Sequence, residues 1–207
     1  GEFFVDNAIR DSNGELMITT NTTEVCQYYA FFFNIATPDS HPELWRKIAE
    51  EFGPNRDVDT TYPNVFRANA FIGNYLRMDI LSRYNMQSQL ILEIQDYFYS
   101  MAQQTGTLWE HMESYASCNH GFASYISHIL YRDVLGVRQI DSANKHITIQ
   151  FTNIDLEQCM GSINIDEELL HLEWKRNDNS IQYELKVPEG YTFDIENRSG
   201  LELILAS

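Results

Sequence analysis

The stretch that decides the fold is Thr23–Ala36, which reads TEVCQYYAFFFNIA. At helical spacing, Tyr28 and Phe32 fall on one face together with most of the other large apolar residues. Phe31 and Ile35 make the remaining side apolar as well. A helix that is apolar on nearly every side is expected to be buried on every side. The segment therefore predicts an inner helix of a larger helical assembly.

The helices next to this one follow a different pattern. Asn21 with Glu24 predicts a capping box at the start of the first helix, and Ser40 with Glu43 predicts a capping box at the start of the second. The second helix carries a single apolar stripe and ends at Gly53-Pro54. It is therefore expected to lie on the surface.

The same two kinds of helix recur further along the chain. Residues 67–84 are apolar on most sides, and residues 87–103 carry one apolar stripe. Residues 119–135 again place apolar side chains inward and end at Gly136. This alternation of inner and outer helices favours an α/α toroid, in which hairpins pack side by side in a ring, over a plain bundle of amphipathic helices.

From about residue 145 the apolar residues alternate with polar ones, which is the period of strands. Turn residues at 177–179, 188–190 and 199–200 divide this part into about six short strands. We therefore expect an α+β chain, with residues 1–136 forming part of a helical barrel and residues 137–207 forming a small antiparallel β-sandwich.

Composition narrows the choice of function. The 207 residues include 14 Lys and Arg against 30 Asp and Glu, a formal net charge of −16. An acidic chain without a basic patch is a poor candidate for binding nucleic acid or an anionic membrane, and it suits a neutral ligand such as a sugar. Cys26, Cys118 and Cys159 lie far apart in the sequence, so neither a zinc motif nor a disulfide framework is indicated, and the compartment is left open.

The candidate site lies in residues 104–118, the longest stretch of the helical part that fits neither period. Glu110 could act as a general base on water, Trp109 could offer an aromatic face to a sugar, and His120, after Asn119, could donate to a sugar hydroxyl. Each residue also has a structural interpretation, as a solvated carboxylate, a packed indole or a helix cap.

Other polar residues are weaker candidates. Those near the starts of the inner helices are expected to be caps or helix–helix hydrogen bonds, Arg56 with Asp57 is expected to brace a loop, and two further carboxylates could replace Glu110. The caps are Asn21, Thr22, Asn69 and Asn74, and the alternative carboxylates are Glu24 and Glu113. His111 and His128 lack partners at ligand spacing, so no metal site is predicted.

Four motifs in order resemble the C-terminal part of bacterial α-L-rhamnosidases of glycoside hydrolase family 78. They are residues 23–30 (TEVCQYYA), 70–77 (AFIGNYLR), 105–110 (TGTLWE) and 117–121 (SCNHG). The resemblance covers most of the chain and is most specific in the last two motifs. It implies the end of an (α/α)6 barrel, a six-hairpin glycosidase fold, followed by a C-terminal β-sandwich.

The resemblance also implies a mechanism and partners. In an inverting glycosidase one carboxylic acid protonates the leaving oxygen while a second carboxylate activates water, with about 6.5–9.5 Å between them. Glu110 falls at the general-base position and His120 at a rhamnose-contacting position, with Trp109 beside the base. A rhamnose-containing glycan is the implied ligand, and no cofactor is implied.

The chain departs from the family pattern in one respect. The general acid and several sugar-binding residues of the family lie in a preceding half of the barrel, so we expect the chain to be inactive alone and to associate through its open barrel edge. Two alternatives stay open: a non-catalytic carbohydrate-binding or assembly module, and another (α/α)6 carbohydrate enzyme such as a polysaccharide lyase.

Overall fold

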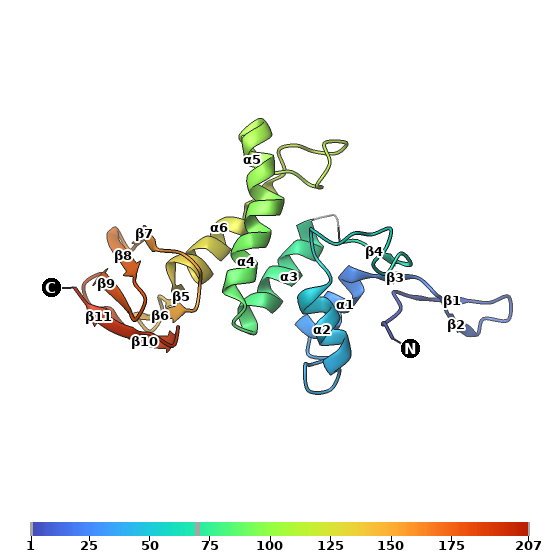
Figure 1. Ribbon diagram of the computed structural model, residues 1–207, viewed down its shortest axis with the longest axis horizontal. Coiled ribbons are helices and arrows are strands. Elements are labelled where there is room, and N and C mark those ends of the chain that lie inside the picture. Colours follow the sequence, from blue (N-terminus) through green and yellow to red (C-terminus); the bar gives the residue numbers. More distant parts are fainter. Residues whose placement is uncertain (1, 69–70, 207) are drawn as a thin grey trace. The chain divides into compact units, whose positions relative to one another are not determined.

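The computed structural model describes residues 2–68 and 71–206 and contains helices and small sheets (Figure 1). The α-helices are α1 (Glu24–Phe32), α2 (Pro42–Glu50), α3 (Phe71–Arg83), α4 (Gln87–Ile94), α5 (Ser100–Thr105) and α6 (Tyr125–Ile129). The strands are β1 (Ala8–Arg10), β2 (Leu16–Ile18), β3 (Thr22–Thr23), β4 (Val65–Phe66), β5 (Val137–Asp141), β6 (His146–Thr152), β7 (Gln158–Ile165), β8 (Glu168–Arg176), β9 (Ser180–Lys186), β10 (Thr192–Arg198) and β11 (Glu202–Leu205). The expected α+β class is confirmed, and the toroid stays a prediction.

The chain divides into two compact units, which are described separately. The first consists of residues up to 84 together with 92–124, and the second of residues 85–91 together with the rest of the chain from 125 onward. π-Helical segments, Gln95–Tyr99 and Leu130–Leu135, follow α4 and α6. Within the described residues no helix is both long and apolar enough to cross a bilayer.

The start of α1 differs from the expected capping box. Thr23 is the N-cap, and its hydroxyl accepts a hydrogen bond of 3.1 Å from the backbone N–H of Cys26. Pairing of β3 with β4 holds Thr23 in the extended conformation that an N-cap requires, so Asn21 lies outside the helix. The box at Ser40 is also wrong, because α2 starts after His41 and the Ser40 hydroxyl instead bonds to Thr37 and His41.

The core of the first unit forms around α1. Tyr28 and Phe31 are completely buried and pack in one cluster with Ile48 of α2 and Ile80 of α3. The opposite face of the α1 segment is not covered, since Tyr29, Phe33 and Ile35 are exposed. The expectation that this helix is buried on all sides is therefore wrong for the chain by itself.

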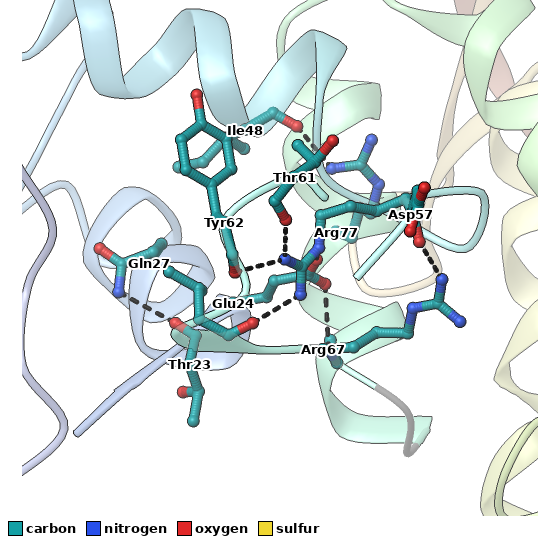
Figure 2. Close-up of polar contacts among 12 residues, drawn as sticks. Thr23, Glu24, Gln27, Ile48, Asp57, Thr61, Tyr62, Arg67 and Arg77 are labelled. Carbon is teal, nitrogen blue, oxygen red and sulfur yellow. Dashed lines mark hydrogen bonds and ion pairs between the residues drawn. The ribbon is translucent and has the colours of Figure 1, made fainter. Parts of the chain in front are cut away.

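An ion pair lies inside this core, between α1 and the loop after α2. The Glu24 and Arg56 side chains are both fully buried, and Glu24 Oε1 lies 2.6 Å from Arg56 Nε. Arg56 also donates to the carbonyl oxygens of Thr61 and Tyr62 at 2.7 and 3.0 Å (Figure 2). The other Glu24 oxygen accepts from the Tyr28 hydroxyl and from the Ala68 N–H.

A second buried pair continues this network. Arg77 of α3 binds both oxygens of Glu93 at 2.6 Å and donates to the Ile48 carbonyl at 2.6 Å. The Tyr28 hydroxyl, 3.4 Å from Arg77 Nη1, connects the two pairs. Burial raises the pKa of Tyr28 well above its usual 10, so this hydroxyl stays protonated and donates to Glu24. Helices α1, α2, α3 and α4 are thereby joined through buried charged groups.

The second unit contains two sheets, with strand orders β10-β6-β5 and β11-β9-β8-β7. Their inner faces meet where the Phe151 ring packs on the Tyr183 ring, with the ring centroids 5.1 Å apart. The expected purely antiparallel arrangement is wrong in two places, since β10 pairs in parallel with β6 and β11 pairs in parallel with β9. After β9 the chain crosses to the other sheet to form β10, and it then crosses back to form β11 next to β9. Such crossover connections can produce parallel neighbours.

Gly136 lies where the last helical segment passes into β5. Its φ of 101° belongs to the region that favours glycine, and an added Cβ would lie 2.7 Å from the Gln150 carbonyl oxygen. Next to it, the Leu135 carbonyl accepts a 3.0 Å bond from the Trp174 indole. The sequence reading of Gly136 as a helix end is confirmed.

The buried Glu24–Arg56 pair gives a stability prediction. Glu24→Gln leaves the Arg56 charge buried without its partner, so the free energy of unfolding should fall by about 3–5 kcal/mol in urea denaturation. Replacing both residues by methionine should cost less than Glu24→Gln alone, because no uncompensated charge then remains. The control is Glu43→Gln, at an exposed side chain of α2, which is expected to change stability by less than about 0.5 kcal/mol. A cost for Glu24→Gln as small as that of the control would contradict the prediction.

Candidate functional site

The candidate site is a loop that folds back on itself between α5 and α6. Gly106 ends α5 in the left-handed conformation, with its N–H bonded to the Ala102 carbonyl. Two backbone bonds then join the arms of the loop, from Glu110 N–H to Ser117 O at 2.9 Å and from His120 N–H to Leu108 O at 2.8 Å. The two arms are thus paired like a short hairpin, which brings Glu110 and His120 together.

Glu110 lies between two imidazoles. Its Oε1 is 3.9 Å from His111 Nε2, and its Oε2 is 3.9 Å from His120 Nδ1. These separations are too long for hydrogen bonds but close enough for attraction when an imidazole is protonated. The Glu110 side chain is 34% exposed, so water can reach the carboxylate. A water-accessible carboxylate of this kind is chemically able to accept a proton from water.

Trp109 anchors the first arm of the loop to α5. The residue is 3% exposed, and its indole N–H donates to the Thr105 hydroxyl at 2.7 Å. Its backbone N–H lies 3.3 Å from the Met101 sulfur, and the Thr107 hydroxyl donates to the Cys118 carbonyl. Because its ring is buried, Trp109 anchors the backbone next to Glu110 and does not offer an aromatic face to a ligand.

The part of the loop that contains Glu113 lies near Tyr97 of the π-helical segment Gln95–Tyr99. Tyr97 from that segment is buried, and burial together with the nearby Glu113 charge raises the pKa of its hydroxyl, against the effect of a hydrogen bond with Asn74. Arg67 approaches the same part of the loop, with Nη1 at 3.8 Å from the Met112 sulfur. π-Helical turns often occur at functional sites, and this one supports the candidate loop.

The remaining sequence candidates have different environments. Asn119 is exposed, and its backbone N–H lies 3.4 Å from the Ser117 hydroxyl. Glu24, the alternative carboxylate, is completely buried in the core network. Arg56 braces its loop through the carbonyls of Thr61 and Tyr62, as expected, although its pairing with Glu24 was not foreseen.

Asn69 and Thr22 were also expected to be helix caps. Asn69 lies outside the described residues. Thr22 is not a helix cap, because its hydroxyl donates to the Asn64 carbonyl at 2.8 Å. Within residues 2–68 and 71–206, no group of three or more His, Cys, Asp or Glu side chains is arranged to hold a metal ion.

His111 is a neighbour of Glu110 that the sequence did not predict. Adjacent residues on an extended strand point to opposite sides, so nothing in the spacing indicated that both would converge. The pairing of His120 with Glu110 depends on the hairpin closure, for which Gly106 was the available signal.

Comparisons with known proteins find similarity at the level of structure. No family model matches the sequence, and no curated protein matches it. The crystal structure of a GH78 family rhamnosidase of Bacillus sp. GL1 superimposes with a TM-score of 0.78 at 14% sequence identity. The match covers 99% of this chain and 21% of the rhamnosidase chain, so this chain spans about a fifth of the length of that protein. The likeness establishes a shared fold.

The anchoring of Trp109 can be tested by hydrogen exchange. Thr105→Val removes the acceptor of the buried indole N–H. The unsatisfied donor should lower the free energy of unfolding by about 1–3 kcal/mol. The loop should open more often, so the Glu110 amide, bonded to Ser117, should exchange faster in NMR measurements. Thr60→Val is the control, since it removes an exposed bond to Asp57 elsewhere in the unit. Unchanged exchange at Glu110 in the Thr105 variant would show that the indole bond does not hold the loop.

Proposed function

We propose that the chain is part of a glycoside hydrolase related to the inverting α-L-rhamnosidases, and that Glu110 is its general base. The observation that carries the proposal is that the Glu110 carboxylate is accessible to water. The paired loop holds this carboxylate between the imidazoles of His111 and His120. The shared fold with a rhamnosidase supports the choice of reaction class.

The proposed roles follow from the position of each group. Glu110 takes a proton from water as the water attacks the anomeric carbon, and a carboxylic acid from outside these 207 residues protonates the leaving oxygen. The two carboxyl groups of an inverting pair stand about 6.5–9.5 Å apart, which leaves room for that water. The hydrolysed bond therefore ends with inverted configuration at the anomeric carbon.

The neighbours of Glu110 are assigned supporting roles. The His120 imidazole and the exposed Asn119 side chain are proposed to contact sugar hydroxyl groups, since both can donate hydrogen bonds. Trp109, buried and bonded to Thr105, is proposed to fix the direction of the Glu110 backbone. A neutral rhamnosyl unit fits the net charge of −16 better than an acidic sugar does.

Turnover and sugar binding together test this function. In a protein that contains this chain together with the complementary barrel half, Glu110→Gln should lower hydrolysis of an aryl α-L-rhamnoside by about 10²- to 10⁴-fold, because it removes the base. The same substitution should change the binding of L-rhamnose little. With the unsubstituted protein, NMR of the first product should show inversion at the anomeric carbon. The 207-residue chain alone should not hydrolyse the substrate.

The outcomes separate the proposal from its alternatives. Glu113→Gln is the matched control, an exposed carboxylate in the same loop, and should leave turnover nearly unchanged. Full activity of the Glu110 variant would contradict the proposal and favour a non-catalytic binding or assembly module. An unsaturated product would indicate a lyase.

We also propose that the exposed apolar face of the α1 segment, formed by Tyr29, Phe33 and Ile35, packs against further barrel helices in a larger protein. In the isolated chain this face should drive self-association, since large exposed apolar patches favour contact. Light scattering should show species larger than a monomer, and Phe33→Ser should reduce their share. Leu205→Ser, at an equally exposed apolar residue of β11, should not. A monodisperse monomer at high concentration would contradict this proposal.

A further inference from the structure

Residues 2–6 form a segment that belongs to no helix or strand and lies against the core of the first unit. The Phe3 and Phe4 side chains are partly buried and pack on the cluster formed by α1, α2 and α3. The hairpin of β1 and β2 comes next in the chain, and its Leu16 and Ile18 side chains are exposed. The position of residues 2–6 therefore depends on the contacts that these residues make themselves.

A buried amide holds the backbone of this segment. The Gln27 side chain of α1 is completely buried, and its Oε1 accepts a 2.9 Å hydrogen bond from the Phe4 N–H. Its Nε2 donates to the Phe4 carbonyl at 2.9 Å and to the Thr23 carbonyl at 2.9 Å (Figure 2). Both polar backbone groups of Phe4 are thus bound as a neighbouring strand would bind them. Gln27 recognises the segment as a peptide backbone.

The side chains before Phe4 are bound by a separate group of residues. The Phe3 ring lies against the rings of Tyr62 and Phe52, with centroid separations of 5.3 and 6.0 Å. Lys47 Nζ lies 5.1 Å from the centre of the Phe3 ring and pairs with the Glu2 carboxylate. An acidic residue followed by an aromatic residue therefore fits this docking surface of Gln27, Lys47, Phe52 and Tyr62.

Two contacts that shape the docking surface are independent of the segment. The Tyr62 hydroxyl donates to Glu51 at 2.6 Å, and the N-cap of α1 is the Thr23 hydroxyl, which accepts from the Cys26 N–H. Asp6 adds bonds from its Oδ1 to the N–H and hydroxyl of Thr23. Water can replace these two bonds when the segment leaves, because they lie in an exposed position.

The docked segment also contributes to the lining of a pocket. This pocket of about 560 Å³ is lined by Glu2 and Phe3 together with Thr22, Glu51 and residues 60–65. Departure of the segment removes Glu2 and Phe3 from that lining. The shape of the pocket therefore depends on whether the segment is docked.

We propose that residues 2–6 are a releasable strap, which leaves and rebinds the docking surface as one unit while the core stays folded. The docking surface is then a recognition site for a short peptide with an acidic residue before two aromatic residues, and the strap is its occupant within the chain. Local opening of this kind is expected of segments with few buried apolar contacts. Release of the strap opens the pocket and is independent of the role proposed for Glu110.

Amide hydrogen exchange of the 207-residue chain tests whether the strap opens as one unit. The Phe4 and Asp6 amides bind different acceptors, which are Gln27 Oε1 and the Asn21 carbonyl. Both amides should show the same protection in NMR measurements, with little dependence on urea. Phe3→Ala changes neither hydrogen bond, yet it should speed exchange at both amides by about tenfold, because it weakens docking of the whole strap.

Core amides and a second variant provide the controls. The helical amides of Tyr28 and Ile48 should be at least about 10²-fold more protected than the strap amides, because they open only with the core. Phe193→Ala removes a partly exposed ring of β10 in the second unit and should leave exchange of the strap amides unchanged. Strap amides that are as protected as the core amides, with the same urea dependence, would overturn the proposal. Faster exchange at Phe4 alone in the Phe3→Ala chain would do the same.

A peptide added to the chain tests recognition by the docking surface. In the Phe3→Ala, Phe4→Ala double variant the strap should be released, while circular dichroism matches that of the unsubstituted chain. A blocked peptide with the sequence of residues 2–6, EFFVD, should then shift the NMR signals of the Gln27 side-chain amide, with a Kd of about 1 mM. The peptide EAAVD should not shift them. Absence of EFFVD binding to the folded double variant at about 10 mM would show that the surface does not recognise the strap as a peptide.

Discussion

The buried pair of Glu24 and Arg56 is the interaction on which the rest of the first unit depends. A charge removed from water is tolerated only when its partner and its other hydrogen-bonding groups are satisfied. Here the carboxylate also bonds Tyr28 and the Ala68 N–H, and the guanidinium binds carbonyl groups of its own loop. One ion pair therefore fixes α1, the loop after α2 and the backbone at Ala68 in a single arrangement.

The same network reaches the candidate site through Arg67. Its guanidinium donates to the Arg56 carbonyl and contacts the Met112 sulfur in the loop of Glu110. The core pair thus positions a side chain that touches the site loop, and Trp109 anchors that loop independently from α5. The paired arms between Leu108 and His120 complete the support of Glu110.

Apolar spacing located the helices but not every buried side, since Tyr29, Phe33 and Phe122 are exposed. It did not identify Glu24 as a buried ion, since its partner Arg56 lies in a distant loop and the sequence offered a local role in a capping box instead. Alternation found strands but not their direction, so the parallel pairings of β10 and β11 were missed. In the candidate loop the structure brings Glu110 and His120 together, whereas the convergence of His111 depends on side-chain directions that spacing does not encode.

The paired loop has a consequence for the order in which the chain folds. Its defining contacts join residues close in sequence, from Met101 and Thr105 to His120, and loops of about ten residues close in about 10–100 ns. The contact between Glu24 and Arg56 must close a longer segment, and the bond from Glu24 to the Ala68 N–H a longer one still. The segment that carries Glu110 is thus able to take up its local geometry early, while the core that will support it is still being assembled.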